Sequence, residues 1–144
     1  MARELPTSLL MFIASRYAVE RVFGALQEAG FRDASLAQSR LMMGIDEGGT
    51  RLSVLAARAQ VAKQTATHLV DKLERAGYVE RVPDPSDGRA RLVRMTARAR
   101  EVLPLARAEE ERIEAEWREH LGTEGMAQLR RHLTALREVT DPYR

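Results

Sequence analysis

One stretch of the sequence places polar and basic side chains beside an apolar stripe. Between positions 63 and 76 apolar residues recur at spacings of three and four, which predicts a helix with one buried face. The stripe consists of Ala66, Leu69, Val70 and Leu73. The polar residues beside it are Lys63, Gln64, Thr65, Thr67 and His68, with Lys72 further along. Glutamine can pair with an adenine edge, and Lys or His can reach guanine or phosphate, so this face suits binding to nucleic acid.

A turn with charged residues follows this stretch. Residues 78–82 and 90–95 have the composition of strands, and residues 83–88 supply prolines, aspartates, a serine and a glycine, which form turns. The pattern predicts a β-hairpin with a long tip. Its second strand contains Arg94, which alternates away from Val93 and Met95. Contact with phosphate and plain exposure are the two alternatives for this arginine.

The charge of the chain is concentrated in its middle. Residues 50–100 contain eleven Lys and Arg but five Asp and Glu, a net charge of +6 in a chain whose total is +2. This distribution indicates a local surface for a polyanion. A solvated basic face without a partner is the alternative, because charge alone is a weak guide to function.

Helical patterns precede the hairpin. Residues 6–29 and about 35–48 form two amphipathic stretches that end at glycines, and Ser53 is expected to cap a short helix over residues 54–59. The helix expected over residues 63–76 comes next and ends before a glycine. Two short helices joined by a tight connection make a helix-turn-helix, in which the second helix is the recognition helix.

Two more helices are expected after the hairpin. Thr96 begins one that reaches about residue 120, with a kink or restart predicted by Pro104, and Thr123 begins the last. The chain is therefore expected to be mainly α with a small β-hairpin. Surplus apolar positions on the first and last helices favour a partner that buries them, and a monomeric bundle is the alternative.

The residues of the basic middle resemble the multiple antibiotic resistance regulator (MarR) family of bacterial transcription factors. The resemblance rests on residues 52–56 (LSVLA), 65–81 (TATHLVDKLERAGYVER), 84–90 (DPSDGRA) and 93–96 (VRMT). The flanking helices agree with the family in number and order. This implies a winged helix-turn-helix fold.

The resemblance also implies an assembly. By this resemblance, residues 1–144 form a single domain. Its dimerisation helices span residues 6–48 and 96–141, and its DNA-binding lobe spans residues 50–95. Two copies would intertwine into a homodimer that reads a near-palindromic site in double-stranded DNA, with half-sites about one helical turn apart.

In the family's hairpin, called the wing, an acidic residue orients an arginine toward the minor groove or phosphate. Asp87 and Arg89 match that pair, and Asp87 can also cap the turn. The family's usual second arginine is replaced by Gly88. A more flexible tip is expected, and Arg89 and Arg91 are alternatives for the residue that enters the minor groove.

Relatives of this kind commonly bind small aromatic or anionic effectors between the dimerisation helices and the lobe. The candidates by position are Arg16, Tyr17, Phe31, Met42 and Met43. A cation beside aromatic and thioether surface suits a benzoate-like ligand. Plain core packing is the alternative, because Met and aromatic residues at helical spacing usually belong to a core.

Other classes of function have little support in the sequence. There is no cysteine, and no two of the three histidines have the spacing of helix neighbours, so neither thiol chemistry nor a metal site is expected. No glycine-rich phosphate loop or nucleophile–base pair predicts an enzyme, a catalytic residue or a cofactor. The apolar run at 9–14 is too short to span a membrane, so a cytoplasmic protein is expected.

The sequence thus predicts a DNA-binding transcription regulator, in particular an effector-responsive repressor. The alternative function is a helical dimerisation or interaction module whose winged lobe does not bind DNA.

Overall fold

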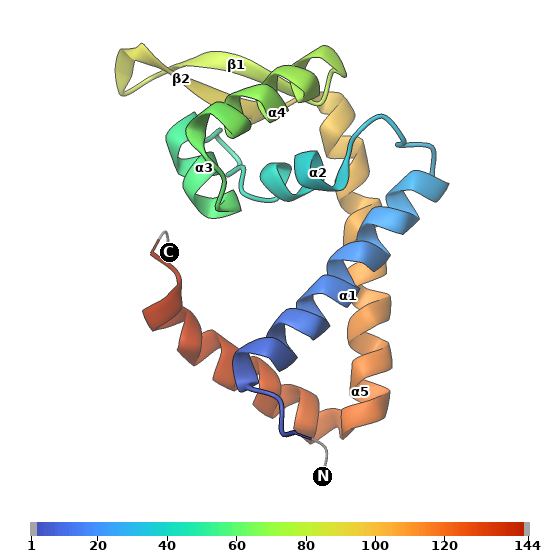
Figure 1. Ribbon diagram of the computed structural model, residues 1–144. Coiled ribbons are helices and arrows are strands. Elements are labelled where there is room, and N and C mark those ends of the chain that lie inside the picture. Colours follow the sequence, from blue (N-terminus) through green and yellow to red (C-terminus); the bar gives the residue numbers. More distant parts are fainter. Residues whose placement is uncertain (1–2, 143–144) are drawn as a thin grey trace. The chain divides into compact units, whose positions relative to one another are not determined.

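The computed structural model describes residues 3–142. Its elements are α1 (Thr7–Glu28), α2 (Leu36–Met42), α3 (Leu52–Ala59), α4 (Lys63–Arg75), β1 (Val79–Asp84), β2 (Asp87–Met95) and α5 (Ala97–Thr140) (Figure 1). The expectation of a mainly helical chain with one β-hairpin is confirmed. The chain divides into two compact units, one up to Ala106 and one from Arg107, and α5 continues from the first into the second.

The core of the first unit joins the short helices α2, α3 and α4 to the hairpin. Its fully buried side chains are Leu41, Leu55, Val70, Leu73, Tyr78 and Val79. Burial of each large apolar side chain contributes roughly 1.5–3 kcal/mol of transfer free energy. The core therefore holds α4 and the hairpin in one packed lobe.

Helix α4 follows the pattern predicted for it. Ala66, Val70 and Leu73 of its apolar stripe are buried, and Leu69 packs against the same core. Gly77 ends the helix with a φ of 82°, and the N–H groups of Gly77 and Tyr78 donate to the carbonyls of Glu74 and Leu73. This is the common glycine stop, in which a left-handed residue lets the last carbonyls find donors.

Two expectations about the helices before α4 are wrong. Helix α2 ends at Met42, since the N–H of Asp46 donates to the Thr50 hydroxyl at 2.8 Å and the chain turns there, although Ile45 still packs on the core. Helix α3 begins at Leu52 with Arg51 as its N-cap, and Ser53 lies in its first turn. The carbonyl of Arg51 accepts the N–H groups of residues 54 and 55.

The hairpin differs from the expected long tip. Both strands continue to a two-residue turn at Pro85 and Ser86, because the Asp84 carboxylate accepts the N–H and hydroxyl of Ser86. Thr50 adds a short bridge at the base: its N–H donates to the Val93 carbonyl and its carbonyl accepts the Val93 N–H, both at 2.9 Å. The hairpin is thus joined to the residues just before α3.

The register of the hairpin is irregular near the turn. Arg91 pairs with Pro83 and Asp87 with Asp84, so residues 88–90 of β2 have no partner on β1. Three extra residues on one strand form a bulge, which bends that strand.

The C-terminal helices separate where the last helix was expected to begin, and the non-helical angles inside α5 are at Gly122 and not at Pro104. Pro104 is inside α5, whereas Gly122 has non-helical angles of φ 80° and ψ 160° and separates two helical segments. Glycine adopts such angles at little cost because it has no Cβ. The separation expected between residues 120 and 123 is therefore present, and it lies at Gly122.

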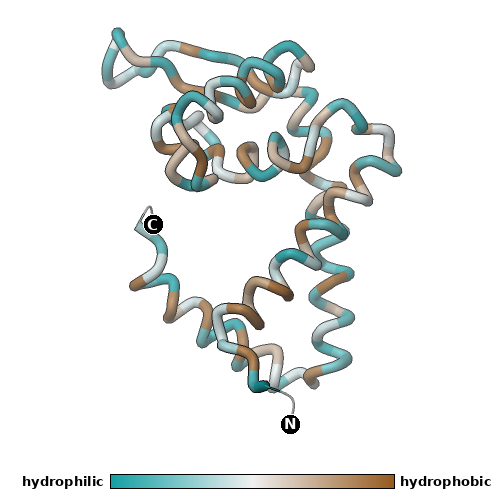
Figure 2. The backbone as a smooth tube through the Cα atoms, viewed as in Figure 1, coloured by the Kyte–Doolittle hydropathy of each residue, from teal (hydrophilic) through white to brown (hydrophobic). Residues whose placement is uncertain are grey.

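Apolar side chains are exposed on α1 and, separately, on the second unit. In and just before α1 they are Leu5, Leu9, Leu10, Met11, Phe12, Ile13 and Tyr17, and Figure 2 shows hydrophobic positions along this helix. In the second unit they are Leu121, Leu133, Leu136 and Val139. Across residues 3–142, no helix is both long and apolar enough to cross a membrane.

Candidate nucleic-acid interface

The first half of α4 presents its polar residues to solvent. Lys63, Gln64, Thr65 and His68 are exposed, and the half-buried Thr67 donates its hydroxyl proton to the Lys63 carbonyl at 2.9 Å. An open hollow of about 450 Å³ is lined by Gln64, Thr65, Thr67, His68 and Asp71. The structure therefore brings the polar residues predicted on this helix to one accessible surface.

The second half of α4 is tied to the hairpin. The Arg81 guanidinium of β1 contacts the carboxylates of Asp71 at 2.7 Å and Glu74 at 2.9 Å. Both acidic residues come from α4, one turn apart. These contacts offset part of the negative charge of the two side chains and fix the hairpin against the helix, while Lys72 on the same helix remains exposed.

Asp84 at the end of β1 is engaged on both carboxylate oxygens. Oδ1 accepts hydrogen bonds from the Ser86 N–H at 2.8 Å and the Ser86 hydroxyl at 2.7 Å. Oδ2 accepts a hydrogen bond from Nε of Arg51 at 2.9 Å and lies 2.8 Å from Nη2 of Arg51 in an ion pair. The hydrogen bonds from Ser86, followed by those from Arg51, lower the pKa of Asp84 to about 2. The carboxylate is therefore ionised at neutral pH and links the turn to α3.

The predicted pair of Asp87 and Arg89 has a different geometry. Asp87 accepts the backbone N–H of Arg89 at 3.1 Å, and its other oxygen lies 3.9 Å from Nη2 of Arg51. Among the described residues, no carboxylate lies within 4.0 Å of the Arg89 guanidinium. Asp87 thus shapes the turn, and the Arg89 side chain is left exposed on the bulge at 88–90.

Arg94 forms an ion pair with Glu80, the residue opposite it on the other strand of the hairpin. Its Nε and Nη2 donate to Oε1 of Glu80 at 3.0 and 2.7 Å, and Glu80 is its direct partner in the ladder. Cross-strand pairs of opposite charge stabilise a hairpin. Arg94 therefore has a structural role that neither of the sequence-based alternatives included.

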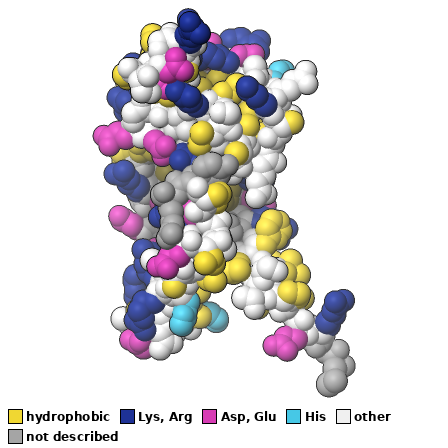
Figure 3. All heavy atoms as spheres, turned by 90° about the vertical axis from the view of Figure 1, so that its left-hand side faces the viewer, with side chains coloured by type: hydrophobic (Ala, Val, Ile, Leu, Met, Phe, Trp, Pro, Cys, Tyr) yellow, Lys and Arg dark blue, Asp and Glu magenta, His cyan; other side chains and the backbone are white. Residues whose placement is uncertain are grey.

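The basic residues of the lobe divide into two groups. Arg51, Arg58, Arg81 and Arg94 make ion pairs within the first unit. By contrast, within residues 3–142 no carboxylate lies within 4.0 Å of Lys63, Lys72, Arg75, Arg89 or Arg91, although Nε of Arg75 donates to the Asp71 carbonyl at 3.3 Å. Figure 3 shows Lys and Arg side chains gathered at the top of its view, where α4 and the hairpin lie in Figure 1. The cations left for an external anion are those of α4 and the wing.

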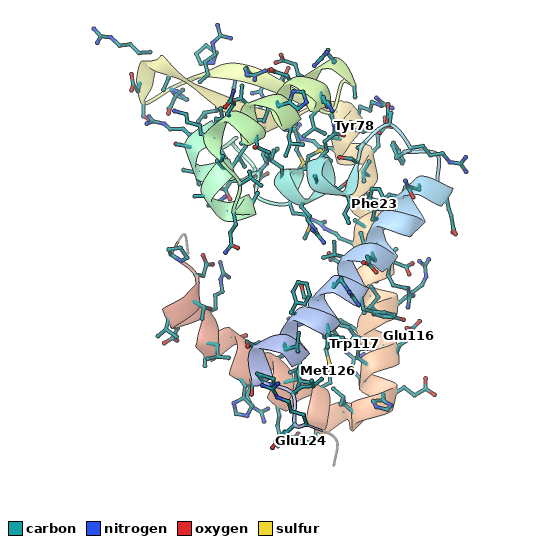
Figure 4. The ribbon with its side chains drawn as sticks, in the orientation of Figure 1. Phe23, Tyr78, Glu116, Trp117, Glu124 and Met126 are labelled. Carbon is teal, nitrogen blue, oxygen red and sulfur yellow. The ribbon has the colours of Figure 1, made fainter. Side chains whose placement is uncertain are left out.

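Asp33, Tyr78 and Arg98 form a junction at the other end of the lobe, which sequence reasoning did not identify. The Tyr78 hydroxyl donates to Oδ1 of Asp33, and Nη2 of Arg98 lies 2.8 Å from Oδ2. Figure 4 places Tyr78 beside the first turns of α5. Burial, followed by the bond to Asp33, raises the pKa of Tyr78 to about 12, and the bonds from Tyr78 and then Arg98 lower the pKa of Asp33.

The five candidate effector residues do not share one environment. Phe31 and Met42 pack against the core of the lobe, which agrees with the alternative of plain packing for these two. Tyr17 and Met43 are exposed, and Arg16 lies 4.0 Å from Glu20 on the same helix. An effector site built from these residues remains an expectation.

Comparisons with known proteins agree with this geometry. Residues 33–90 match the model of the MarR family. No curated protein sequence matches the chain. Solved structures that are similar over nearly the whole chain include three proteins, of which one is named a transcriptional regulator and another is named MarR.

The first is a crystal structure of MarR, with 26% identity, a TM-score of 0.75 and coverage of 96% of this chain and 92% of that one. The second is the transcriptional regulator Tm0710 from Thermotoga maritima, with 27% identity, a TM-score of 0.63 and coverage of 96% of both chains. The third, RV1404 from Mycobacterium tuberculosis, has 23% identity, a TM-score of 0.69 and coverage of 95% of both chains.

Proposed function

We propose that the chain is a winged-helix transcription regulator of the MarR family, whose model matches residues 33–90, and that it binds DNA as a homodimer. One observation carries the proposal. Four cations that have no carboxylate within 4.0 Å among the described residues, namely Lys63, Lys72, Arg89 and Arg91, lie on α4 and β2, the two elements that a winged helix presents to a duplex. Phosphates are the anions that such a surface binds.

The proposed docking assigns a task to each element. Residues 63–68 of α4 enter the major groove, where Gln64 reads an adenine edge and Lys63 and His68 reach guanine or phosphate. Lys72 contacts the backbone. Arg89 or Arg91 of the wing enters the minor groove or grips phosphate. Arg94 contributes indirectly, by holding the hairpin through Glu80.

The dimer is supported by the exposed apolar side chains of α1. Phe12 is 58% exposed and Leu10 is 52% exposed, and large apolar side chains at this density on one helix favour a covering partner. We assign residues 6–48 and 96–141 to dimerisation and residues 50–95 to DNA binding. Two recognition helices related by a two-fold axis would read half-sites about one helical turn apart.

Repression is the mode of regulation that we propose, with release by a small aromatic or anionic effector. Both recognition helices must fit successive major grooves together, so a ligand that changes their spacing lowers the affinity for the operator. Titration of salicylate or benzoate into a protein–DNA complex tests this step. Undiminished DNA binding at saturating concentrations of both compounds would argue against this class of effector.

DNA binding is tested with a fluorescent duplex of the region upstream of the gene. The wild type is expected to bind with an affinity that falls as salt rises, by about 0.9 units of log K per unit of log salt for each phosphate contacted. The double variant Gln64→Ala/Arg89→Ala should lose sequence preference, while Arg40→Ala, an exposed change on α2, should not. Binding that ignores both salt and the double substitution would support the interaction module instead.

The dimer is tested by sedimentation of the variant Phe12→Glu. A charge in the middle of the apolar face of α1 should shift the wild-type dimer to the monomer mass. Ala57→Glu is the matched control, because Ala57 is exposed and lies on α3, outside the residues assigned to dimerisation. A monomeric wild type would refute the proposed assembly.

A further inference from the structure

The wing carries its exposed arginine on an irregular piece of backbone. Arg89 is the middle residue of the bulge at 88–90, and no residue of β1 pairs with that segment. Gly88 and Arg89 are exposed, and Ala90 is half-buried. A bulge re-aims the side chains that it contains. The position of Arg89 therefore depends on whatever fixes the two ends of the bulge.

One end of the bulge is fixed by Asp84, which is Asp87's partner in the ladder. Asp84 is only 8% exposed, although the residues that follow it in the turn are exposed. Its carboxylate accepts three hydrogen bonds, two from Ser86 and one from Nε of Arg51, and forms an ion pair with Nη2 of Arg51; all four distances lie between 2.7 and 2.9 Å. Charge-assisted hydrogen bonds of this kind are short and strong.

Arg51 connects this carboxylate to the core of the lobe. It is the N-cap of α3, whose Leu55 and Ala56 are buried, and its side chain reaches a residue 33 positions away. The residue before it, Thr50, is bonded to Val93 at the base of β2. The hairpin is thus attached to the same short segment twice, once through its backbone at the base and once through side chains at the tip.

We infer that Arg51 and Asp84 are positioning residues for DNA binding, which together hold the bulge at 88–90 and so set the distance between Arg89 and α4. This inference rests on the proposed function. Neither residue is needed at the duplex itself. Their effect is to keep the arginine of the wing where it meets the DNA while α4 lies in the major groove.

If Arg51 instead contacted the DNA directly, the substitution Asp84→Asn would have the opposite effect on DNA affinity. The Arg51 side chain is 45% exposed, so it could itself contact a phosphate. In that case Asp84→Asn, which removes a negative charge and releases the guanidinium, should tighten DNA binding. As a positioning pair, the same substitution should weaken DNA binding, although the net charge becomes more positive. The sign of the change in affinity therefore separates the two roles.

The binding experiment compares Arg51→Met, Arg51→Lys, Asp84→Asn and the control Arg40→Met on the upstream duplex. Arg40→Met also removes one positive charge, but it breaks no described side-chain contact. Arg51→Met and Asp84→Asn should each weaken binding by about tenfold, equivalent to about 1.4 kcal/mol. Arg51→Lys should restore part of the loss, and Arg40→Met should stay near the wild type. Tighter binding by Asp84→Asn would overturn the inference.

A second readout uses the free protein, so it does not depend on DNA. Trypsin cuts after Arg89 and Arg91 faster when the wing is less firmly held, and the rate is followed by mass spectrometry. Arg51→Met and Asp84→Asn should raise this rate, and Arg40→Met should not. An unchanged rate refutes the anchor, whether or not the protein binds DNA. A wild type that binds no duplex, together with faster cleavage in the two variants, would instead refute the proposed function and leave the anchor established.

Discussion

The guanidinium carbon of Arg98 lies 4.3 Å from the centroid of the Tyr78 ring, and both side chains bond to Asp33. Arg98 also donates to the Ala76 carbonyl at the end of α4. The three residues come from the connection between α1 and α2, the start of the hairpin and the first turn of α5. They therefore join the ends of the lobe to the helices that lead out of it.

Removal of the Tyr78 hydroxyl tests this junction. Tyr78→Phe keeps the ring beneath Arg98 but leaves Asp33 without the phenol donor, so the free energy of unfolding should fall by about 0.5–1.5 kcal/mol. Urea denaturation at neutral pH measures the change. Tyr17→Phe is the control, because that side chain is 46% exposed. An equal loss in both variants would contradict a special role for the junction.

Acid should destabilise the lobe through two aspartates. The pKa of Asp84 is lowered from 3.8 to about 2, and that of Asp33 is also lowered. The unfolded chain therefore binds more protons than the folded chain in this range, and stability present above about pH 4 is lost as the pH falls toward 2. The urea midpoint, measured from pH 5 to pH 2, should fall less steeply in Asp33→Asn/Asp84→Asn than in the wild type. Parallel curves would contradict this origin of the acid sensitivity.

Two adjacent glycines should respond differently to alanine. Gly49 has a φ of 102°, and a Cβ there would lie 3.0 Å from the Leu92 Cβ and 3.3 Å from the Val93 carbonyl oxygen. A Cβ added at Gly48 would meet no atom within 4 Å, and the φ of Gly48 is not positive. Gly49→Ala should thus cost about 1–3 kcal/mol, whereas Gly48→Ala should be nearly neutral. Thermal melts of the two variants give the comparison, and similar melting temperatures would count against it.

An arginine at Gly88 should strengthen DNA binding. A Cβ at this position meets nothing within 4 Å, so the bulge can accept a side chain. Gly88→Arg adds a cation beside Arg89, and the slope of log K against log salt should steepen by about 0.9 if it reaches a phosphate. Gly88→Ala is the control, because alanine restricts the backbone as arginine does but adds no charge. If alanine produces the same gain, stiffening of the bulge is the cause.

The sequence predicted the elements better than the contacts between them. The stripe from Ala66 to Leu73 and the glycine stop at Gly77 are local patterns, and both were confirmed. The pair of Glu80 and Arg94 was missed because it depends on the register of the hairpin, which antiparallel alternation alone could have suggested. Nothing local links Arg51 to Asp84, since they meet only after the core has packed α3 beside the hairpin.

The apolar pattern also misled in identifiable ways. Ile45 continues the spacing of α2 but packs on the core from a turn, since burial does not require helical backbone. Ser53 is a good capping residue by type, yet Leu52 is already helical. Such boundaries depend on tertiary contacts, here the hydrogen bonds around Thr50, which a single sequence does not display.

The contacts of Arg81 with Asp71 and Glu74 divide α4 into two functional halves. The second half stabilises the fold, because its acidic side chains bind Arg81 of the hairpin. The first half, residues 63–68, makes no ion pair among the described residues and bears most of the polar side chains that face outward. If the proposed docking holds, replacing side chains in the first half alone should change the base preference, and a segment exchanged with a relative should end before Asp71.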